Sequence, residues 1–315
     1  MGGSDVLQGI SVWKRLHPVP HWHYVSYGLS DLYENSHDAE HSGWGIELSF
    51  RLACAEDAVQ PPAWVLNFLQ NLARYVDTRG NVFRSGDWMT ANGPIALDQQ
   101  TRLCSMGFVL DPELGRIDTP HGYVDFIQVV GLTQAEELAA KRWNTRALLD
   151  ALSPYMPLWI TDLARPCLLE QPTLQAEVEN GIQRDGSSSG LLYADVLEWQ
   201  QHKRLLRAPL MEITLGARVV DDLLALLPLR LPYGRDFLLG GAGRLLSFQS
   251  AESNRVEATE DRLDLHLTPS ALQAMLASLR AKAGIYEIPG LTGLRLHIQR
   301  SHIRDANGEV VRTVG

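Results

Sequence analysis

Cysteine is scarce in this 315-residue chain, which contains only Cys54, Cys104 and Cys167. They are far apart and odd in number, so the sequence offers neither a disulfide framework nor a paired-cysteine metal site. Long apolar runs are also missing. The longest candidate, residues 223–231, is shorter than the ~18 residues that a membrane span needs, and it contains Pro228. The N-terminus lacks the basic, apolar and small-residue pattern of a secretory signal. These absences predict a protein of the reducing cytoplasm.

The common catalytic motifs are absent as well, including the P-loop, G-x-S-x-G, H-E-x-x-H and G-x-G-x-x-G. The Gly-rich residues 240–243 precede a strand-like run rather than a P-loop lysine, so they predict a hairpin turn. Cys104 has no identifiable base near it in the sequence, which favours a buried structural thiol over a nucleophile. Four aspartates could in principle furnish a catalytic carboxylate pair: Asp31, Asp87, Asp125 and Asp162. No spacing among them favours catalysis over loop hydrogen bonding.

Four histidines near the N-terminus suggest a zinc site, since imidazole is a good zinc ligand: His21, His23, His37 and His41. His21 and His23 are two residues apart, so on a strand they would share one face. Their aromatic neighbours Trp22 and Tyr24 favour a packed aromatic edge instead, and His37 to His41 resembles a polar loop. No complete ligand set accompanies the histidines. We therefore predict neither a bound metal nor a cofactor.

Charge is distributed unevenly along the chain. Residues 1–187 contain 13 Lys and Arg against 23 Asp and Glu, whereas residues 188–315 contain 15 against 14. An acidic first half argues against nucleic acid as the main ligand, because phosphate binding needs clustered cations. The charge balance changes at residues 184–190, where small polar residues and two glycines indicate a linker or an exposed loop. We therefore predict two domains, residues 1–187 and 188–315.

Hydrophobic periodicity predicts both helices and strands. Residues 46–52 alternate strictly and predict a strand with one buried face. The apolar residues from Val65 to Val76 recur at helical spacing. Further elements are expected over four stretches: strands at 123–130, 159–163 and 263–267, and a helix from Thr133, where Thr133 and Glu136 form a capping box. A helix that begins at Thr268 and ends at Gly284 and a strand at 294–298 are also expected. The irregular interleaving favours an α+β fold, with two packed mixed α/β-type domains, over a doubly wound sheet.

One segment has an unusual composition. Residues 21–33 read HWHYVSYGLSDLY and resemble the signature of the suppressor of fused family. The similarity continues in order through GWGIELSFRL at 43–52, LARYV at 72–76, SGD at 85–87 and DGS at 185–187. In the second half GRDF at 234–237 resembles a further family segment. The animal members have a long insertion where this chain has only residues 191–207, so it resembles a compact, bacterial-type member.

The resemblance implies a non-catalytic protein that clamps an extended partner peptide in a cleft between its two domains. By position it implies six partner-binding residues: Tyr75, Phe83, Asp87, Asp236, Phe237 and Leu238. An exposed strand edge would supply backbone hydrogen bonds, and aromatic pockets would supply specificity. The residues alone favour Tyr75 and Phe83 as core aromatics and Asp87 as a turn residue, and the resemblance brings the binding interpretation level with this one. Both interpretations stay open.

Two functions remain for this sequence. The resemblance favours a protein-binding module, in bacteria an immunity protein that neutralises a toxin domain. The acidic first half would suit a basic partner. The alternative is a hydrolase-like enzyme with an unrecognised Asp and His site in the interdomain cleft. A groove with a free strand edge would favour binding, and polar groups converging in a closed pocket would favour catalysis.

Overall fold

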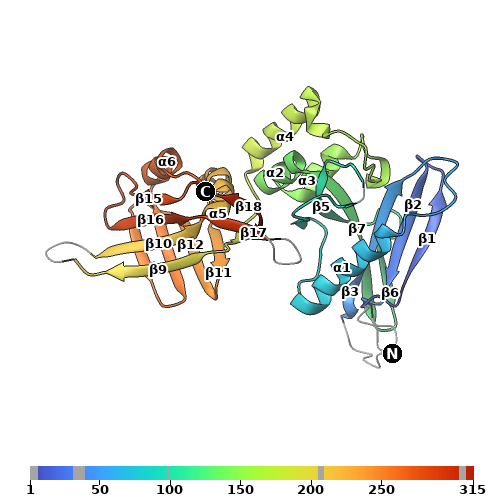
Figure 1. Ribbon diagram of the computed structural model, residues 1–315, viewed down its shortest axis with the longest axis horizontal. Helices are drawn as coiled ribbons and strands as arrows, with labels where there is room; N and C mark the ends of the chain where they lie inside the picture. Colours follow the sequence, from blue (N-terminus) through green and yellow to red (C-terminus); the bar gives the residue numbers. More distant parts are fainter. Residues whose placement is uncertain (1–5, 31–39, 98, 205–208, 305–309) are drawn as a thin grey trace. The chain divides into compact units, whose positions relative to one another are not determined.

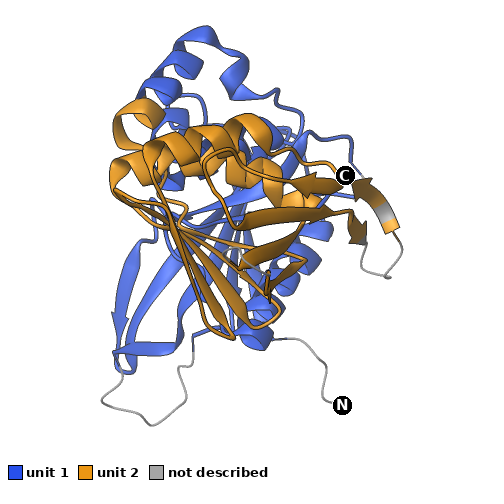
Figure 2. Ribbon diagram, turned by 90° about the vertical axis from the view of Figure 1, so that its left-hand side faces the viewer, with its two compact units in different colours: residues 1–180 blue, residues 181–315 orange. Residues whose placement is uncertain are grey.

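The computed structural model describes residues 6–30, 40–97, 99–204, 209–304 and 310–315. The chain divides into two compact units, residues 1–180 (unit 1) and 181–315 (unit 2) (Figure 2). Both units combine helices with mixed sheets, so the predicted α+β class is confirmed. Among the described residues no helix is long and apolar enough to span a membrane.

Unit 1 is built on one twisted, seven-stranded mixed sheet with the order β1-β2-β3-β7-β5-β4, and β6 pairs with β7 (Figure 1). Its strands are β1 (Gly9–Arg15), β2 (His21–Tyr27), β3 (His41–Ala53), β4 (Trp88–Thr90), β5 (Leu103–Leu110), β6 (Arg116–Thr119) and β7 (Gly122–Thr133). β3 and β7 run parallel, whereas the other neighbours are antiparallel. β1 and β4 therefore form the two edges of this sheet.

The expectation of one buried face for residues 46–52 is wrong, because β3 is a central strand with both faces covered. Its apolar residues Ile46, Leu48, Phe50 and Leu52 join the main hydrophobic cluster of unit 1. The residues between them point to the opposite face and are equally buried: Glu47, Ser49 and Arg51. A strict alternation of apolar and polar residues normally marks a half-exposed strand. Here the polar face is covered and satisfied by internal hydrogen bonds.

Helices cover both faces of this sheet. α1 (Trp64–Arg79) packs its predicted stripe, including Val65 and Val76, into the main hydrophobic cluster and ends at Gly80. α3 (Thr145–Leu152) lies on the opposite face, because a Cβ on Gly107 would contact Thr145 and Leu149 while the adjacent Phe108 packs into the α1 cluster. α2 (Gln134–Arg142) begins at Thr133 with the predicted capping box.

Residues 159–163 do not form the predicted strand. The short 3₁₀ helix η1 (Pro157–Trp159) occupies the start of this segment, and only an isolated bridge joins Thr161 to Leu52. Two backbone hydrogen bonds of 2.9 Å hold Thr161 against β3, from its N–H to the Arg51 carbonyl and from the Ala53 N–H to its own carbonyl. The Gln128 amide adds a hydrogen bond to the carbonyl of Leu158 at 2.8 Å. A second 3₁₀ turn, η2 (Leu168–Glu170), leads to α4 (Pro172–Asp185), within which unit 1 ends.

Unit 2 contains two mixed sheets and a hairpin. Their strands are β8 (Leu191–Tyr193), β9 (Leu197–His202), β10 (Leu210–Gly216), β11 (Phe237–Gly241), β12 (Arg244–Ser250), β13 (Arg255–Ala258), β14 (Arg262–Leu267), β15 (Gly284–Tyr286), β16 (Leu294–Gln299), β17 (Ser301–Arg304) and β18 (Val310–Val314). One sheet has the order β15-β16-β10-β9 and the other β13-β14-β12-β11-β8, while β17 pairs with β18. The predicted turn at 240–243 does connect an antiparallel hairpin, β11 and β12.

Unit 2 has two α-helices, α5 (Ala217–Leu226) and α6 (Pro269–Ser278), and the 3₁₀ turns η3 (Leu227–Leu229) and η4 (Leu231–Tyr233). Thr268 caps α6 as expected, because its hydroxyl accepts the backbone N–H of Ala271 at 3.2 Å. α6 ends at Ser278, well before Gly284, which instead begins β15.

Residues 184–190 are more ordered than a linker composition indicates. The last turn of α4 extends to Asp185, and Ser187 is fully buried. The carbonyl of Ser187 accepts hydrogen bonds from the guanidinium groups of Arg230 and Arg235, at 2.8 and 3.1 Å. The Tyr233 hydroxyl donates to the carbonyl of Gln183 at 2.6 Å. Small residues are therefore needed here for close packing against η4 rather than for flexibility.

Candidate functional site

The histidines of β2 are core residues. His21, Trp22, His23 and Tyr24 are all buried, with the two histidines on one face of the sheet and the two aromatics on the other. The Nδ1 atom of His21 lies 2.7 Å from the carbonyl oxygen of Val19, which it uses as an acceptor. In the described part of the chain, no three His, Cys, Asp or Glu side chains gather as a metal site would require. His37 lies outside the described residues, and His41 is exposed.

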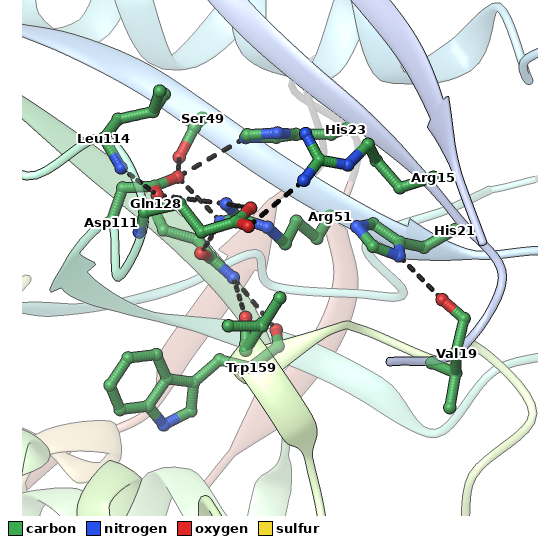
Figure 3. Close-up of polar contacts among 12 residues, drawn as sticks. Arg15, Val19, His21, His23, Ser49, Arg51, Asp111, Leu114, Gln128 and Trp159 are labelled. Atoms are coloured by element: carbon green, nitrogen blue, oxygen red, sulfur yellow. Dashed lines mark hydrogen bonds and ion pairs between the residues drawn. The ribbon is translucent and has the colours of Figure 1, made fainter. Parts of the chain in front are cut away.

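A buried ion pair lies at the centre of the covered polar face, between β3 and the end of β5 (Figure 3). Arg51 donates to Asp111 from Nη1 to Oδ2 at 2.7 Å and from Nη2 to Oδ1 at 3.0 Å. Ser49 donates to the same carboxylate at 2.6 Å. Burial by itself favours the neutral acid, but hydrogen bonds from His23 and Arg51 and the Arg51 charge hold the pKa of Asp111 well below its usual range. Asp111 is therefore ionised.

Further polar residues extend this cluster to four strands and the loop at 157–161 (Figure 3). Arg51 also hydrogen-bonds Gln128 on β7, and its Nη2 lies 2.8 Å from Glu113. Glu113 in turn accepts from Arg15 on β1 at 3.2 Å. Two cations thus face two carboxylates. Because each charged group of the cluster lies beside a group of opposite charge, the cluster joins strands.

Glu47 forms a second buried polar site, where β2 turns into the following loop. Its Oε1 accepts the backbone N–H groups of Gly28, Leu29 and Ser30 at 2.9, 3.1 and 2.8 Å. The hydroxyls of Ser30 and Ser26 also donate to this carboxylate. Burial raises the pKa of Glu47 in spite of these donors. Glu47 fixes the loop that follows the HWHYVSY strand, so much of the family-like signature has a structural role.

The first three candidate residues, Tyr75, Phe83 and Asp87, lie together at the β4 edge of unit 1. The ring of Phe83 stacks on Phe108 with centroids 4.1 Å apart and an interplanar angle of 9°. The ring of Tyr75 also stacks on Phe83, with centroids 5.5 Å apart and an interplanar angle of 20°. Phe83 and Phe108 are buried and Tyr75 is half-buried. These three rings form an aromatic column that runs from the buried core to the half-buried Tyr75. The core interpretation thus holds for Phe83, and a partner contact at Tyr75 stays a prediction.

Asp87 is the turn residue that the residue pattern indicated, and it is also exposed. Its Oδ2 accepts the backbone N–H of Arg84 at 2.7 Å, and its own N–H donates to the Arg84 carbonyl at 3.0 Å. The carbonyl of Asp87 accepts the N–H of Phe108 at 3.0 Å, which joins the turn to the aromatic column. β4 follows immediately and pairs with β5, and no other described strand pairs with it.

The remaining three candidates belong to unit 2 and differ in exposure. Asp236 is exposed, Leu238 is half-buried and Phe237 is fully buried against Phe248, at 6.3 Å between ring centroids. Leu238 pairs with Leu191 of β8, the short edge strand of the five-stranded sheet. β8 exposes Leu191 and Tyr193, the latter at 79%. The sequence did not predict this edge, because Leu191, Leu192 and Tyr193 form an apolar run that is also typical of a core strand.

Cys104 on β5 is half-buried rather than fully buried. Burial, together with the nearby Glu137 carboxylate, raises the pKa of its thiol. A raised pKa keeps the sulfur protonated at neutral pH, so the described surroundings of Cys104 do not generate a nucleophilic thiolate.

The fold and these residues define a mixed α/β protein in which each unit has a short, open strand edge. A family model described as "Suppressor of fused protein (SUFU)" matches residues 3–166, more than half of the chain. The chain therefore belongs to the suppressor of fused family. The curated human and mouse proteins named "Suppressor of fused homolog" are each 36% identical to it over 205 residues, which cover 60% of this chain. The alignment covers 42% of those proteins, so the chain spans less than half the length of its curated relatives.

Two solved structures are similar to this chain. "Crystal structure of Drosophila Suppressor of Fused" aligns with a TM-score of 0.77 at 23% identity, covering 94% of this chain and 89% of the other, and shows the shared fold. "The Sufu-Fu complex crystal structure" aligns with a TM-score of 0.53 at 32% identity, covering 58% of this chain and 84% of the other. The second structure contains a family member in complex with a protein partner.

Proposed function

We propose that this chain is a non-catalytic binding protein that clamps an extended segment of a partner protein between its two units. The observation that carries the proposal is the β4 edge, which an aromatic column and the exposed Asp87 flank. An open edge offers backbone donors and acceptors to an added strand, and neighbouring side chains then select the sequence. The similarity of this chain to the structure of the Sufu-Fu complex supports the same class of function.

In unit 1, Tyr75 presents the outer end of the aromatic column, while Phe83 supports it from below. Aromatic side chains with a buried support and a solvent-facing ring are typical binding anchors. Asp87 supplies a carboxylate beside the edge. One of its oxygens caps the turn at Arg84. The other oxygen of this exposed side chain is placed to accept a hydrogen bond from a hydroxyl, an imidazole or a cation of the partner.

In unit 2, β8 is the corresponding open edge, with Leu191 and Tyr193 exposed on it. Phe237 and Leu238 belong to the neighbouring strand β11, and they contribute by fixing the position of β8 through the core and the Leu238–Leu191 pairing. Asp236 immediately precedes β11 and is exposed. It therefore contributes a second carboxylate to partner recognition.

The charge of the chain points to a basic partner. The excess of ten acidic over basic residues in residues 1–187 attracts cationic surfaces and accelerates their association. We propose a basic toxin domain, such as a nuclease, which this chain neutralises as an immunity protein. Co-expression with the product of a neighbouring toxin gene tests this step separately: protection from growth arrest, lost in the Asp87→Ala variant, supports it.

The direct experiment is a pull-down from the source cells with the full chain, followed by mass spectrometry and calorimetry on the recovered partner. Asp87→Ala should weaken binding by about 2–5 kcal/mol if the carboxylate pairs with a partner donor in a desolvated contact. Slower amide exchange at Trp88 and Thr90 in the complex would locate the added strand on β4, because the N–H groups of these two residues point away from β5.

The matched control is Asp77→Ala, which removes another exposed carboxylate at the end of α1. It should leave affinity unchanged. Thermal melts of both variants separate binding from folding, because an exposed substitution normally changes the free energy of unfolding by about 0.5 kcal/mol or less. Equal affinity of the wild type and Asp87→Ala would reject the site.

A further inference from the structure

The edge strand β13 (Arg255–Ala258) has an inner face that the rest of unit 2 leaves uncovered. β13 lies at the end of the five-stranded sheet opposite β8 and pairs only with β14 among the described strands. Val256 lies opposite Leu265, and Ala258 opposite Leu263. Both leucines are buried, so Val256 and Ala258 face the same side as the core. Val256 nevertheless remains 37% exposed.

A groove of about 330 Å³ explains this exposure, since it runs beneath Val256 and Ala258. Three buried apolar residues line it: Met211 on β10, Leu294 on β16 and Leu291 in the loop before β16. Asn254 holds one wall, because its side chain accepts the N–H of Thr268 at 2.8 Å and donates to the carbonyl of Gly290 at 3.4 Å. The groove is thus preformed, with Met211, Leu291 and Leu294 in its lining beside polar residues such as Gln201 and Thr292, and with an open strand edge along it.

The outer face of β13 adds a charge pattern. Arg255 and Glu257 flank Val256 and point away from the core, with more than half of each side chain exposed. Their ion pair, 3.3 Å between Arg255 Nε and Glu257 Oε1, is solvent-exposed and therefore weak. A strand added to β13 would place its own residues directly opposite both charges, where opposite charges attract and like charges repel.

We propose that β13 is a second docking edge, which binds an extended segment of a partner protein in antiparallel orientation. The segment places one leucine-sized apolar side chain in the groove beside Val256. The residue before this anchor is basic and faces Glu257, and the residue after it is acidic and faces Arg255. Because the site lies wholly within unit 2, it is independent of the β4 edge and of Asp87.

The test uses two blocked peptides and the full chain. The matched peptide has a Lys-Leu-Glu core flanked by threonines, and the swapped peptide has a Glu-Leu-Lys core with the same flanks. Fluorescence polarisation measures binding of each. Two cross-strand charge pairs predict that the wild type prefers the matched peptide by about fivefold. In the double variant Arg255→Glu with Glu257→Arg, the preference should invert.

A second variant tests the groove itself. Val256→Asp places a charge beside the apolar anchor and should weaken binding of the matched peptide by about tenfold or more. Ile285→Asp is the control, because Ile285 is an exposed apolar residue on β15, the edge strand of the other sheet of unit 2. It should retain the wild-type affinity. Circular dichroism melts of both variants confirm that the fold persists.

Three results would overturn the proposal: no binding of either peptide at millimolar concentration, equal affinity for both peptides, or equal losses in Val256→Asp and Ile285→Asp. Inversion of the preference in the charge-reversed variant is specific to this site, because a general effect of net charge cannot produce it. The double substitution leaves the net charge of the chain unchanged.

Discussion

The guanidinium of Arg51 and the carboxylate of Asp111 form a two-bond ion pair in which both side chains are completely buried. It connects the central strand β3 of unit 1 to the segment after β5, and Glu113 and His23 surround it (Figure 3). A buried pair of this kind is costly to form, and it becomes strongly destabilising when one partner is removed.

Removal of Asp111 should therefore unfold unit 1 more readily. We expect Asp111→Ala to lower the free energy of unfolding by about 3–5 kcal/mol, because Arg51 is left as an uncompensated buried charge. Urea titrations of the full chain measure the effect. The control is Arg116→Ala, which breaks the surface Arg116–Asp125 pair and should leave the free energy of unfolding nearly unchanged, because exposed ion pairs contribute little. Similar losses in both variants would show that the Arg51–Asp111 pair is not the stabilising element.

Stability should also depend on pH through His21. Burial, opposed in part by the Val19 carbonyl, lowers the pKa of His21 below 6.5. The unfolded chain then binds a proton more readily than the folded one, so the free energy of unfolding falls as the pH drops below about 6.5. The stability keeps falling until the pH drops below the lowered pKa that His21 has in the folded chain. Thermal melts between pH 7.5 and about 4.5 measure the decrease.

The variant His21→Gln should flatten this slope, because glutamine does not titrate. His41→Gln is the control, since His41 is exposed, and it should retain the full pH dependence. The Asp111 carboxylate does not affect this slope, because its pKa is depressed in the folded chain. The stability that it provides is lost only when the pH falls below about 3.8. An unchanged slope in His21→Gln would assign the effect to another group.

Glu47 should be essential to the loop after β2. Glu47→Ala leaves the N–H groups of Gly28, Leu29 and Ser30 without their acceptor, and we expect a loss of about 3–5 kcal/mol in the free energy of unfolding. Glu47→Gln keeps one acceptor oxygen and should cost less. Urea titration compares the two variants. An equal cost for both would mean that the negative charge, rather than the acceptor oxygen, stabilises the loop.

A matched pair of glycines tests the packing of residues 184–190. Gly186 and Gly234 have similar left-handed backbones, with φ of 65° and 69°. A Cβ on Gly186 would lie 2.5 Å from the carbonyl oxygen of Leu229, whereas one on Gly234 meets nothing within 4 Å. Gly234→Ala should therefore cost about 1–2 kcal/mol from backbone strain alone, and Gly186→Ala about 2–5 kcal/mol because overpacking is added. Equal losses in urea titration would contradict close packing at Gly186.

Local sequence patterns predicted those elements whose formation depends on residues close together in the chain. The Thr133 capping box, the apolar stripe of α1 and the 240–243 hairpin all formed as expected. Each relies on contacts within a few residues, such as a hydroxyl that accepts a nearby N–H or side chains at helical spacing. The irregular interleaving of predicted helices and strands likewise indicated the α+β class. The family resemblance, rather than any local pattern, proposed Tyr75, Phe83 and Asp87 as one candidate site.

Only the tertiary structure decided which polar residues are buried. Arg51 joins Asp111, Glu113 and Gln128, residues 60 to 77 positions away in sequence, and nothing in its own segment distinguishes it from a solvated strand arginine. Likewise, the glycine and serine residues at 184–190 have the composition of a linker, yet Arg230 and Arg235 both donate to the carbonyl of Ser187. Burial depends on what covers a segment, and the covering residues come from distant parts of the chain, which local periodicity does not encode.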